Sequence, residues 1–302
     1  MTHSITLGDV SVLRTVEYEG TTRPPEEMFG DLPAEVWQAH RPWLAPDFWD
    51  PRTGLLTSCV QTWVLRSAGR TILIDTGVGD AKERPAMPAF HQLHTGYLAR
   101  LAAAGVRPED VDVVVNTHLH ADHVGWNTRL VDGEWLPTFP RAQYLFPRAD
   151  YDFWNPAHQH TRRMEAANRN VFEDSVEPVV RAGLATLWED SFVIDENLTL
   201  APAPGHTPGS CVVLLSSGQD RAVFVGDLLH NPVQVVEPQC NSCFCEDPAG
   251  ARDSRHRVLG EAADAGRIVF PAHLNGERPG MRVERSGSRF AIRSWASLAA
   301  TA

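Results

Sequence analysis

The chain has 302 residues, of which 43% are hydrophobic and 22% charged, and its formal net charge is −11. That hydrophobic content supports a large core, whereas the acidic balance argues against a nucleic-acid partner, because phosphate binding needs a basic surface. No apolar run in the sequence approaches the roughly 20 residues that span a bilayer, and residues 1–10 lack the basic and apolar segments of a signal peptide. We therefore expect a cytoplasmic protein that binds neither nucleic acid nor membrane.

Residues 1–55 are predicted to form an N-terminal arm that packs on the core, and residues 56–302 the main domain. Residues 11–19 alternate enough to form a strand. Trp37, Trp43, Phe48 and Trp49 then lie close together among prolines. Such an arm either packs across the main domain or also lines a pocket. Aromatic-rich arms are often exchanged between subunits, which makes a homodimer a further expectation.

From residue 57 onward, short apolar strands alternate with helices. The pattern predicts strands at residues 59–66, 71–74, 111–116, 142–146, 198–203, 211–215, 222–225 and 268–270, and helices at residues 97–104, 162–172 and 248–265. Strands that alternate with helical segments are typical of a layered α/β fold.

The most informative stretch is His118-Leu119-His120-Ala121-Asp122-His123, which places four metal-competent side chains within six residues. On a helix, His118 and His120 would point to nearly opposite sides. On an extended segment both imidazoles can face the same way while Leu119 turns into the core. Because a buried strand precedes this box, we expect it to begin where that strand opens into a loop. The alternative is a cluster of surface histidines.

Three further candidates follow later strands. His206 lies in a Pro-Gly-His turn, Asp227 ends the strand at 222–225, and His273 follows the strand at 268–270. Together with the box they supply five imidazoles and two carboxylates, a donor set that suits two Zn²⁺ ions, with manganese, iron or cobalt as alternatives. None of these side chains is a thiolate, so the pattern does not predict a structural zinc site of the cysteine type.

These motifs resemble those of the metallo-β-lactamase superfamily. The resemblance covers residues 55–292 and includes the box, Gly205-His206, Gly226-Asp227, Ala272-His273 and the upstream Asp75-Thr76-Gly77. It implies a four-layer αββα sandwich with the metals at one rim between the two sheets. It assigns the first ion to His118, His120 and His206, the second ion to Asp122, His123 and His273, and the bridging position to Asp227.

The resemblance also implies a reaction. Two ions that share a water lower its pKa and create a hydroxide nucleophile, and one of them polarises a carbonyl or phosphoryl oxygen. Asp122 would orient the nucleophile, and Asp75 would be a hydrogen-bond partner rather than a ligand. The implied function is a dinuclear zinc hydrolase for a small ester, lactone or organophosphate-like substrate, closest to the acyl-homoserine lactonases and the methyl parathion hydrolase group. The alternatives are an iron-dependent dioxygenase and a thioesterase of the glyoxalase II type.

Several aromatic residues bear on the substrate. His230 occupies the region where acyl-homoserine lactonases carry a tyrosine. It is a candidate catalytic residue that contacts the substrate or its leaving group; the alternative is a histidine packed beneath the site. Trp126 would either wall the pocket and favour an apolar or aromatic substrate or lie in the core. Phe153 and Trp154 carry the same two alternatives.

Cys240, Cys243 and Cys245 form a C-x2-C-x-C cluster in the segment after Asp227. This spacing is not that of a common zinc finger, and a fourth ligand is not evident. We expect a substrate-loop segment with free thiols, with a local disulfide and a third metal site as alternatives.

Overall fold

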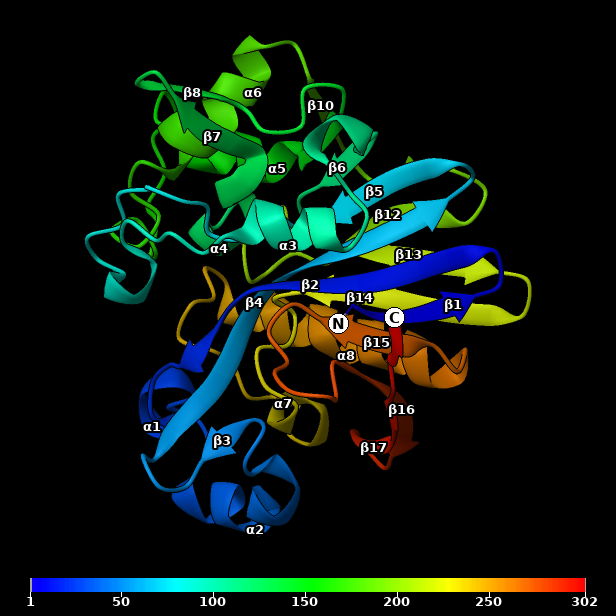
Figure 1. The fold of residues 1–302 in the computed structure, drawn as a ribbon. Helices are drawn as coiled ribbons and strands as arrows, with labels where there is room; N and C mark the ends of the chain where they lie inside the picture. The colour runs from blue at the N-terminus through cyan, green and yellow to red at the C-terminus, as the bar shows by residue number, and fades with distance from the viewer. Residues whose placement is uncertain (1, 302) are drawn as a thin grey trace.

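Two β-sheets packed face to face form the centre of the molecule, and helices cover both outer faces (Figure 1). The structure is a computed structural model that describes residues 2–301. The larger sheet contains, in spatial order, β10 (Ala185–Trp188), β9 (Gln143–Pro147), β6 (Val113–Val115), β5 (Arg70–Ile74), β4 (Leu55–Ser67), β2 (Val10–Thr21), β1 (Thr2–Leu7) and β18 (Ala299–Thr301), with β3 (Trp49–Asp50) paired to β4.

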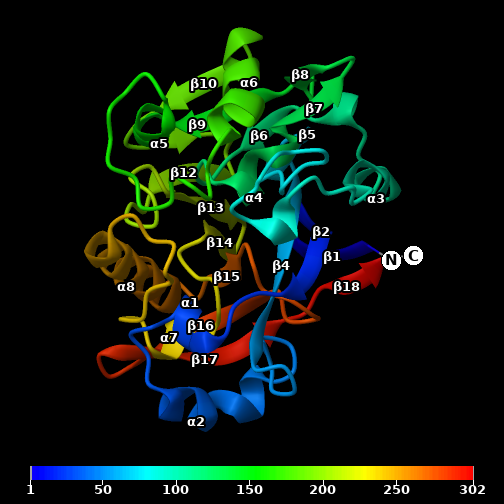
Figure 2. The ribbon, with the colours of Figure 1, turned by 90° about the vertical axis from the view of Figure 1, so that its left-hand side faces the viewer.

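The strands of the smaller sheet lie side by side in chain order. They are β11 (Phe192–Val193), β12 (Leu198–Pro202), β13 (Cys211–Ser217), β14 (Asp220–Gly226), β15 (Ile268–Pro271), β16 (Gly280–Ser286) and β17 (Arg289–Ala296). A separate hairpin joins β7 (Thr128–Val131) to β8 (Glu134–Pro137). Figure 2 shows the two chain ends side by side, where β18 pairs antiparallel with β1.

The helices are mostly short. They are α1 (Pro25–Met28), α2 (Ala34–Leu44), α3 (Tyr97–Ala103), α4 (Ala121–Val124), α5 (Arg148–Trp154), α6 (Glu177–Arg181), α7 (Val233–Val236) and α8 (Pro248–Asp264). Single turns of 3₁₀-helix lie at Pro88–Phe90, Pro108–Asp110 and Gly125–Asn127, and one π-helical turn lies at Phe172–Val176. Within residues 2–301, none of these helices has the length and apolar character needed to cross a membrane.

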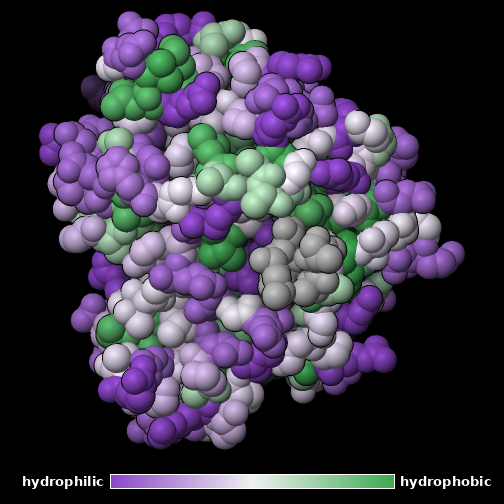
Figure 3. All heavy atoms as spheres, viewed as in Figure 1, coloured by the Kyte–Doolittle hydropathy of each residue, from purple (hydrophilic) through white to green (hydrophobic). Residues whose placement is uncertain are grey.

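The apolar side chains fill three layers between and around the sheets. In the middle layer, Trp63 of the larger sheet packs against Phe224 and Phe270 of the smaller one. Residues of α3, α5 and α6 cover the outer face of the larger sheet, and residues of α7 and α8 cover that of the smaller one. This is the predicted αββα order. The face seen in Figure 3 is largely hydrophilic, with apolar residues in small separate patches.

The strand before the box shows how the sequence positions the site. All three valines of β6 are buried, and the strand pairs in parallel with β5 on one side and β9 on the other. A run of β-branched residues suits a strand buried on both faces. The box therefore begins just after the end of a central strand of the larger sheet, as predicted from the residues.

Each predicted strand coincides with an observed one, but the predicted helix at 162–172 is wrong. Residues 163–170 form turns instead. The Glu246 carboxylate accepts hydrogen bonds from the backbone N–H groups of Arg163 and Met164, at 2.7 and 2.8 Å. The Arg162 guanidinium donates to the backbone carbonyls of Phe153 and Asn155. These tertiary contacts outweigh the helix propensity of the segment.

The predicted arm is composite. Residues 2–21 form β1 and β2 and belong to the larger sheet. The aromatic part of the arm, including α2, packs with residues of α8 and the outer face of the smaller sheet. The division of the chain at residue 55 stays a prediction.

Candidate metal centre

The box lies at the end of β6, between the two sheets. The backbone of His120 is extended, and α4 begins at the next residue. Leu119 is fully buried in the outer core of the larger sheet. The predicted alternation is therefore present, since His118 and His120 turn to one side and Leu119 to the other.

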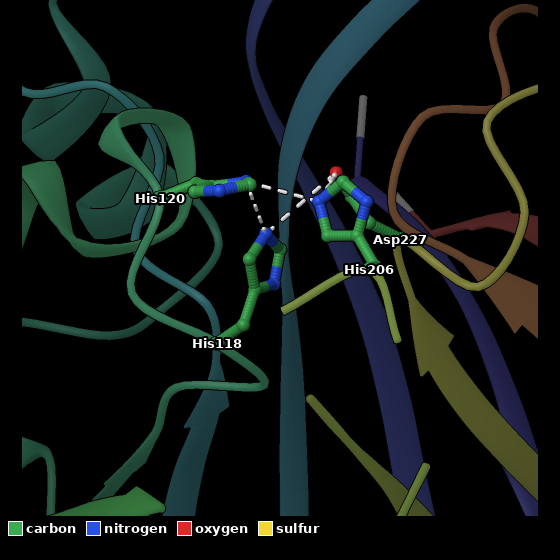
Figure 4. A group of neighbouring side chains, drawn as sticks. All are labelled: His118, His120, His206 and Asp227. Carbon is green, nitrogen blue, oxygen red and sulfur yellow. Dashed lines mark hydrogen bonds and ion pairs between the residues drawn. The ribbon is translucent and has the colours of Figure 1, made fainter. Parts of the chain in front are cut away.

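Three imidazoles and one carboxylate form the first group. Nδ1 of His120 lies 3.1 Å from Nε2 of His118 and 2.9 Å from Nε2 of His206. The Oδ2 atom of Asp227 lies 3.2 Å from Nε2 of His206 and 3.7 Å from Nε2 of His118. Figure 4 shows the three rings, each with a nitrogen directed at the space between them, and the Asp227 carboxylate beside it.

The second group stands on the other side of the same carboxylate. The Oδ1 atom of Asp227 lies 2.9 Å from Nε2 of His273 and 3.2 Å from Nε2 of His123. Asp122 completes the group, with its carboxylate oxygens 3.6 Å from Nε2 of His273 and 3.8 Å from Nε2 of His123. One oxygen of Asp227 thus faces each group, and all seven sequence-predicted residues lie together. We call these seven residues the metal cluster.

Four of the five ring nitrogens that point away from the metal cluster have partners of their own, whereas Nε2 of His120 is buried and has no hydrogen-bond partner among the described residues. Nδ1 of His123 lies 2.8 Å from the Asp75 carboxylate, and Nδ1 of His273 lies 2.8 Å from the backbone carbonyl of Cys59. Such partners fix the tautomer and orientation of a ligating histidine. Nδ1 of His118 faces the Thr117 hydroxyl at 3.1 Å, and Nδ1 of His206 faces the Cys245 sulfur at 3.8 Å.

Burial and mutual charge set the protonation of the metal cluster. Burial lowers the pKa of His118 and of His120 well below the ordinary value, and neighbouring imidazoles add to this effect. Burial would raise the pKa of Asp227, but His273 and His123 hold it well below its usual range. Neutral imidazoles and ionised carboxylates are the forms that bind divalent ions.

The pKa values of the other three rings are shifted in the opposite direction. Burial opposes protonation of His206, but the Asp227 carboxylate raises the pKa of His206 to about 9. The same carboxylate raises the pKa of His123 and of His273 against the effect of burial. Ion binding at such a site releases protons.

The donor atoms fit divalent ions. Tetrahedral Zn²⁺ with Zn–N bonds of about 2.1 Å separates its nitrogen ligands by about 3.4 Å, close to the 2.9 and 3.1 Å separations around His120. Nε2 of His123 and Oδ1 of Asp227 are buried and have no hydrogen-bond partner among the described residues. A divalent ion in each group would satisfy these atoms, and both groups have the composition and spacing to hold one.

A cavity of about 370 Å³ opens beside the metal cluster. Its floor includes His120, Asp122, Asp227 and His273, and its walls come from residues 18–29 of the arm and from the segments at 56–60, 86–90, 164–168 and Phe244. Apolar side chains such as Met28, Phe29, Met87 and Phe90 line much of the cavity. Part of the arm therefore lines the cavity, and its tryptophans pack into the core nearby.

The structure separates the two alternatives for most of the aromatic candidates. His230 lines the cavity, is buried, and has its Nε2 atom 3.1 Å from Oδ2 of Asp227. Trp126 lies in the core instead of the cavity wall, because its ring stacks on Tyr97 and its Nε1 atom donates to Glu17 at 2.6 Å. Trp154 packs against the ring of His120, with 5.3 Å between ring centroids. Phe153 is not among the residues that line the cavity.

All five cysteines are free, so the alternative of a local disulfide is wrong. Cys240 and Cys245 are buried, and Cys243 is exposed. Among residues 2–301, the groups with metal-ligand spacing contain no cysteine. Phe244, between two of these cysteines, lines the cavity.

Sequence reasoning missed two buried carboxylates that hold the site together. Asp150 accepts hydrogen bonds from the backbone of Leu119, from the Thr207 hydroxyl and from the backbone of Gly209, and so ties the box to the turn that carries His206. Glu17 accepts from the backbone of Val78 and Gly79 and from Trp126. An isolated acidic residue in a strand or a first helical turn carries no sequence signal for such a role.

Comparison with known proteins agrees with this geometry. The chain is 30% identical to the N-acyl homoserine lactonase AttM of Azorhizobium caulinodans, over 38% of this chain and 39% of that one. It is 32% identical to metallo-beta-lactamase domain-containing protein 1 of Xenopus laevis, over 58% of this chain and 59% of that one. The chain thus spans about two fifths to three fifths of the length of these curated relatives.

Solved structures share the fold over the whole chain. The dizinc quorum-quenching lactonase AidC, in complex with a product, matches with a TM-score of 0.79 and 19% identity, over 100% of this chain and 98% of that one. The hydrolase AbOPH matches with a TM-score of 0.79 and 22% identity, over 100% and 98%. The family model for the metallo-beta-lactamase superfamily matches residues 60–273, a range that includes every residue of the metal cluster. This chain therefore belongs to the metallo-β-lactamase superfamily.

Proposed function

We propose that this chain is a dinuclear zinc hydrolase that cleaves a small ester, lactone or organophosphate-like substrate. The observation that carries the proposal is the position of Asp227, whose two carboxylate oxygens face two separate groups of ligands at the floor of an apolar cavity. Each group has three further donors, and Asp227 lies within 3.2 Å of His206 in one group and 2.9 Å of His273 in the other. Such an arrangement suits a pair of ions a few ångströms apart.

In this proposal, His118, His120 and His206 hold the first ion, and Asp122, His123 and His273 hold the second. Bound ions would supply an acidified water as the nucleophile and a Lewis acid for the substrate oxygen. Asp227 holds the two groups at a fixed separation. Asp122 lines the cavity and is the most exposed member of the metal cluster, with 18% of its side chain accessible. It is therefore placed to accept a hydrogen bond from the attacking water and to orient it.

His230 is the second proposed catalytic residue. Burial lowers the pKa of His230 to about 4, so its ring is neutral at pH 7. With Nε2 directed at Asp227, the Nδ1 atom is buried and has no hydrogen-bond partner among the described residues. A neutral ring in the cavity lining can exchange a hydrogen bond with a substrate oxygen or with the leaving group.

The cavity favours a substrate with an apolar or aromatic group. Its walls carry methionine and phenylalanine side chains, and the charged lining residues Arg23 and Glu27 are themselves paired, 3.8 Å apart. A volume of about 370 Å³ is in the range of small-molecule sites. Relatives that are named as lactonases of N-acyl homoserine lactones support a substrate with an acyl group.

A substrate screen on the zinc-loaded protein tests the proposal. We expect turnover of acyl lactones or aryl esters that stops when a chelator removes the metal and returns when zinc is added. A panel of lactones, aryl esters, phosphotriesters and a glutathione thioester separates the substrate classes. Bound zinc below two ions per chain, or activity that survives complete metal removal, would contradict the proposal. Iron in the purified protein together with oxygen consumption would favour the dioxygenase alternative instead.

A further inference from the structure

Four of the five clustered histidines have a partner at the outer ring nitrogen, the exception within the described residues being Nε2 of His120, and these four partners are unequal. His118, His123 and His273 each direct Nδ1 at an oxygen atom, between 2.8 and 3.1 Å away. His206 directs Nδ1 at a sulfur atom instead, the thiol of Cys245 at 3.8 Å. A thiol sulfur is a weaker acceptor than a carboxylate or a carbonyl oxygen. His206 therefore has the softest support among these four rings.

The backbone fixes the Cys245 sulfur against this ring. Directly after Cys245, the N–H of Glu246 donates to the carbonyl of His206 at 2.9 Å, and the N–H of Asp247 donates to the carbonyl of Gly205 at 2.8 Å. These two backbone hydrogen bonds join residues 240–247, which we call the cysteine segment, to residues 204–209, which we call the histidine turn. Cys245 itself is buried, with 1% of its surface accessible. The sulfur thus meets the ring at a set position and is shielded from water.

Gly205 keeps this junction close. Its φ angle is +132°, and a Cβ atom there would lie 2.0 Å from the backbone nitrogen of Ala251 at the start of α8. Any residue larger than glycine at position 205 would therefore displace the turn that carries His206 from the first turn of α8.

We propose that Cys245 is a positioning residue whose sulfur accepts the Nδ1–H of His206 and so holds Nε2 of that ring towards the first ion. This inference rests on the proposed two-metal function. The proposal assigns different roles to the three cysteines of the C-x2-C-x-C cluster. Cys245 supports a ligand, whereas Cys240 packs in the core behind it and Cys243 faces solvent.

Cys240 offers a matched control. It is a buried free thiol in the same segment, with 3% of its surface accessible, and within the described residues its sulfur has no imidazole partner. Cys245→Ala and Cys240→Ala remove the same atom from similar surroundings. Only the first removes a hydrogen-bond acceptor from a proposed ligand.

The experiment measures zinc affinity and histidine chemical shifts. Competition with a chromophoric chelator should show that Cys245→Ala lowers the affinity for one of the two zinc ions by about 10- to 100-fold. This is the typical effect of removing a hydrogen-bond partner of a metal ligand. Cys240→Ala should bind both ions like the unmodified chain. In the ¹H–¹⁵N spectrum of zinc-loaded protein, Cys245→Ala should shift the side-chain nitrogens of His206, and Cys245→Ser should restore part of the affinity.

The outcomes separate this inference from the function on which it rests. Fewer than two zinc ions per unmodified chain would contradict both. Two ions in the unmodified chain, with unchanged affinity and unchanged His206 signals in Cys245→Ala, would overturn the role of Cys245 alone. Equal loss of affinity in Cys245→Ala and Cys240→Ala would also overturn it, because the effect would then come from packing.

Discussion

The floor of the cavity and its walls are built in different ways. The floor consists of four residues of the metal cluster, His120, Asp122, Asp227 and His273. The cluster follows buried strands and is held from behind by further polar groups such as Asp75 and Asp150. The walls combine the ends of β2 and β4 with α1, the segments at 86–90 and 164–168, and Phe244. The difference indicates that substitutions in the walls alter substrate choice with less effect on the metal ligands than substitutions behind the floor.

Replacing the shared carboxylate should have the largest effect. Asp227→Asn keeps the shape of the side chain but removes the charge that faces both groups of the metal cluster. We expect a loss of at least ~1000-fold in kcat/KM together with loss of bound metal, measured by kinetics and by metal analysis. A variant that keeps two ions and activity within tenfold would show that the floor does not depend on this residue.

The support behind the floor should matter next. Asp75→Asn weakens the acceptor of the His123 Nδ1 hydrogen bond at 2.8 Å, so we expect metal affinity to fall by about 10- to 100-fold. Asp112→Asn is the control, because the Asp112 carboxylate accepts from the backbone of Thr71 at the opposite end of β6. Equal affinities in the two variants would mean that the floor needs no support of this kind.

Glu17 gives a pH test of the same support. Burial raises the pKa of Glu17 from 4.5 to about 7, although four hydrogen-bond donors oppose the rise. The folded state therefore binds this proton more tightly than the unfolded state, and the contribution of Glu17 to stability is present below pH 4.5 and is lost as the pH rises through 7. Glu17→Gln removes this titration. It also places an amide donor against the backbone donors of Val78 and Gly79.

We therefore expect Glu17→Gln to be less stable than the unmodified chain, with a deficit that narrows between pH 5 and pH 7 by about 1.4 kcal/mol per pH unit. Denaturant unfolding of the metal-free proteins across this range measures the difference, and the absence of metal separates it from zinc binding. A deficit that is constant or widens as the pH rises would show that Glu17 is already ionised in the folded protein.

His230 lies where floor and wall meet. Its Nε2 atom contacts Asp227, and its ring also packs near Phe244, with 5.9 Å between centroids. We expect His230→Ala to lower kcat/KM about tenfold while both zinc ions stay bound. His230→Gln keeps hydrogen-bonding groups at this position, so its kcat/KM should lie between those of His230→Ala and the unmodified chain. An unchanged kcat/KM would assign His230 to packing beneath the site.

The same division between floor and wall explains what the sequence could predict. The seven residues were predictable as candidates because alternate residues of an extended segment share a face, and because His206, Asp227 and His273 each follow an apolar strand. Their division between two ions came from the resemblance to the superfamily. Their convergence depends on the packing of the two sheets, since the box follows β6 of the larger sheet whereas Asp227 and His273 follow β14 and β15 of the smaller one. The β-branched run at β6 was enough to place the box at the end of a buried strand.

The walls and supports were not predictable, because they depend on contacts between distant segments. Trp126 looks like a pocket residue from its place beside the box, yet Glu17, 109 residues earlier, holds it in the core. The segment at 162–172 has a helical pattern, yet the backbone N–H groups of Arg163 and Met164 donate hydrogen bonds to the Glu246 carboxylate instead. Periodicity carries no information on partners so far apart in the chain.

A change in the wall should have the smallest effect and a selective one. Phe244 contributes an apolar face to the cavity from the cysteine segment, where its ring lies near His230 and Arg23. Phe244→Ala removes buried contact with the apolar group of the substrate, which should raise KM about three- to tenfold for long acyl or aryl substrates and leave kcat and KM for the shortest substrate unchanged.

Phe153→Ala is the control, since Phe153 is also half-buried but does not line the cavity. Steady-state kinetics over a series of acyl chain lengths measures the dependence. If Phe244→Ala lowers kcat equally for every chain length, Phe244 affects the chemical step as well as substrate binding, and the separation of chemistry from substrate choice fails at this wall.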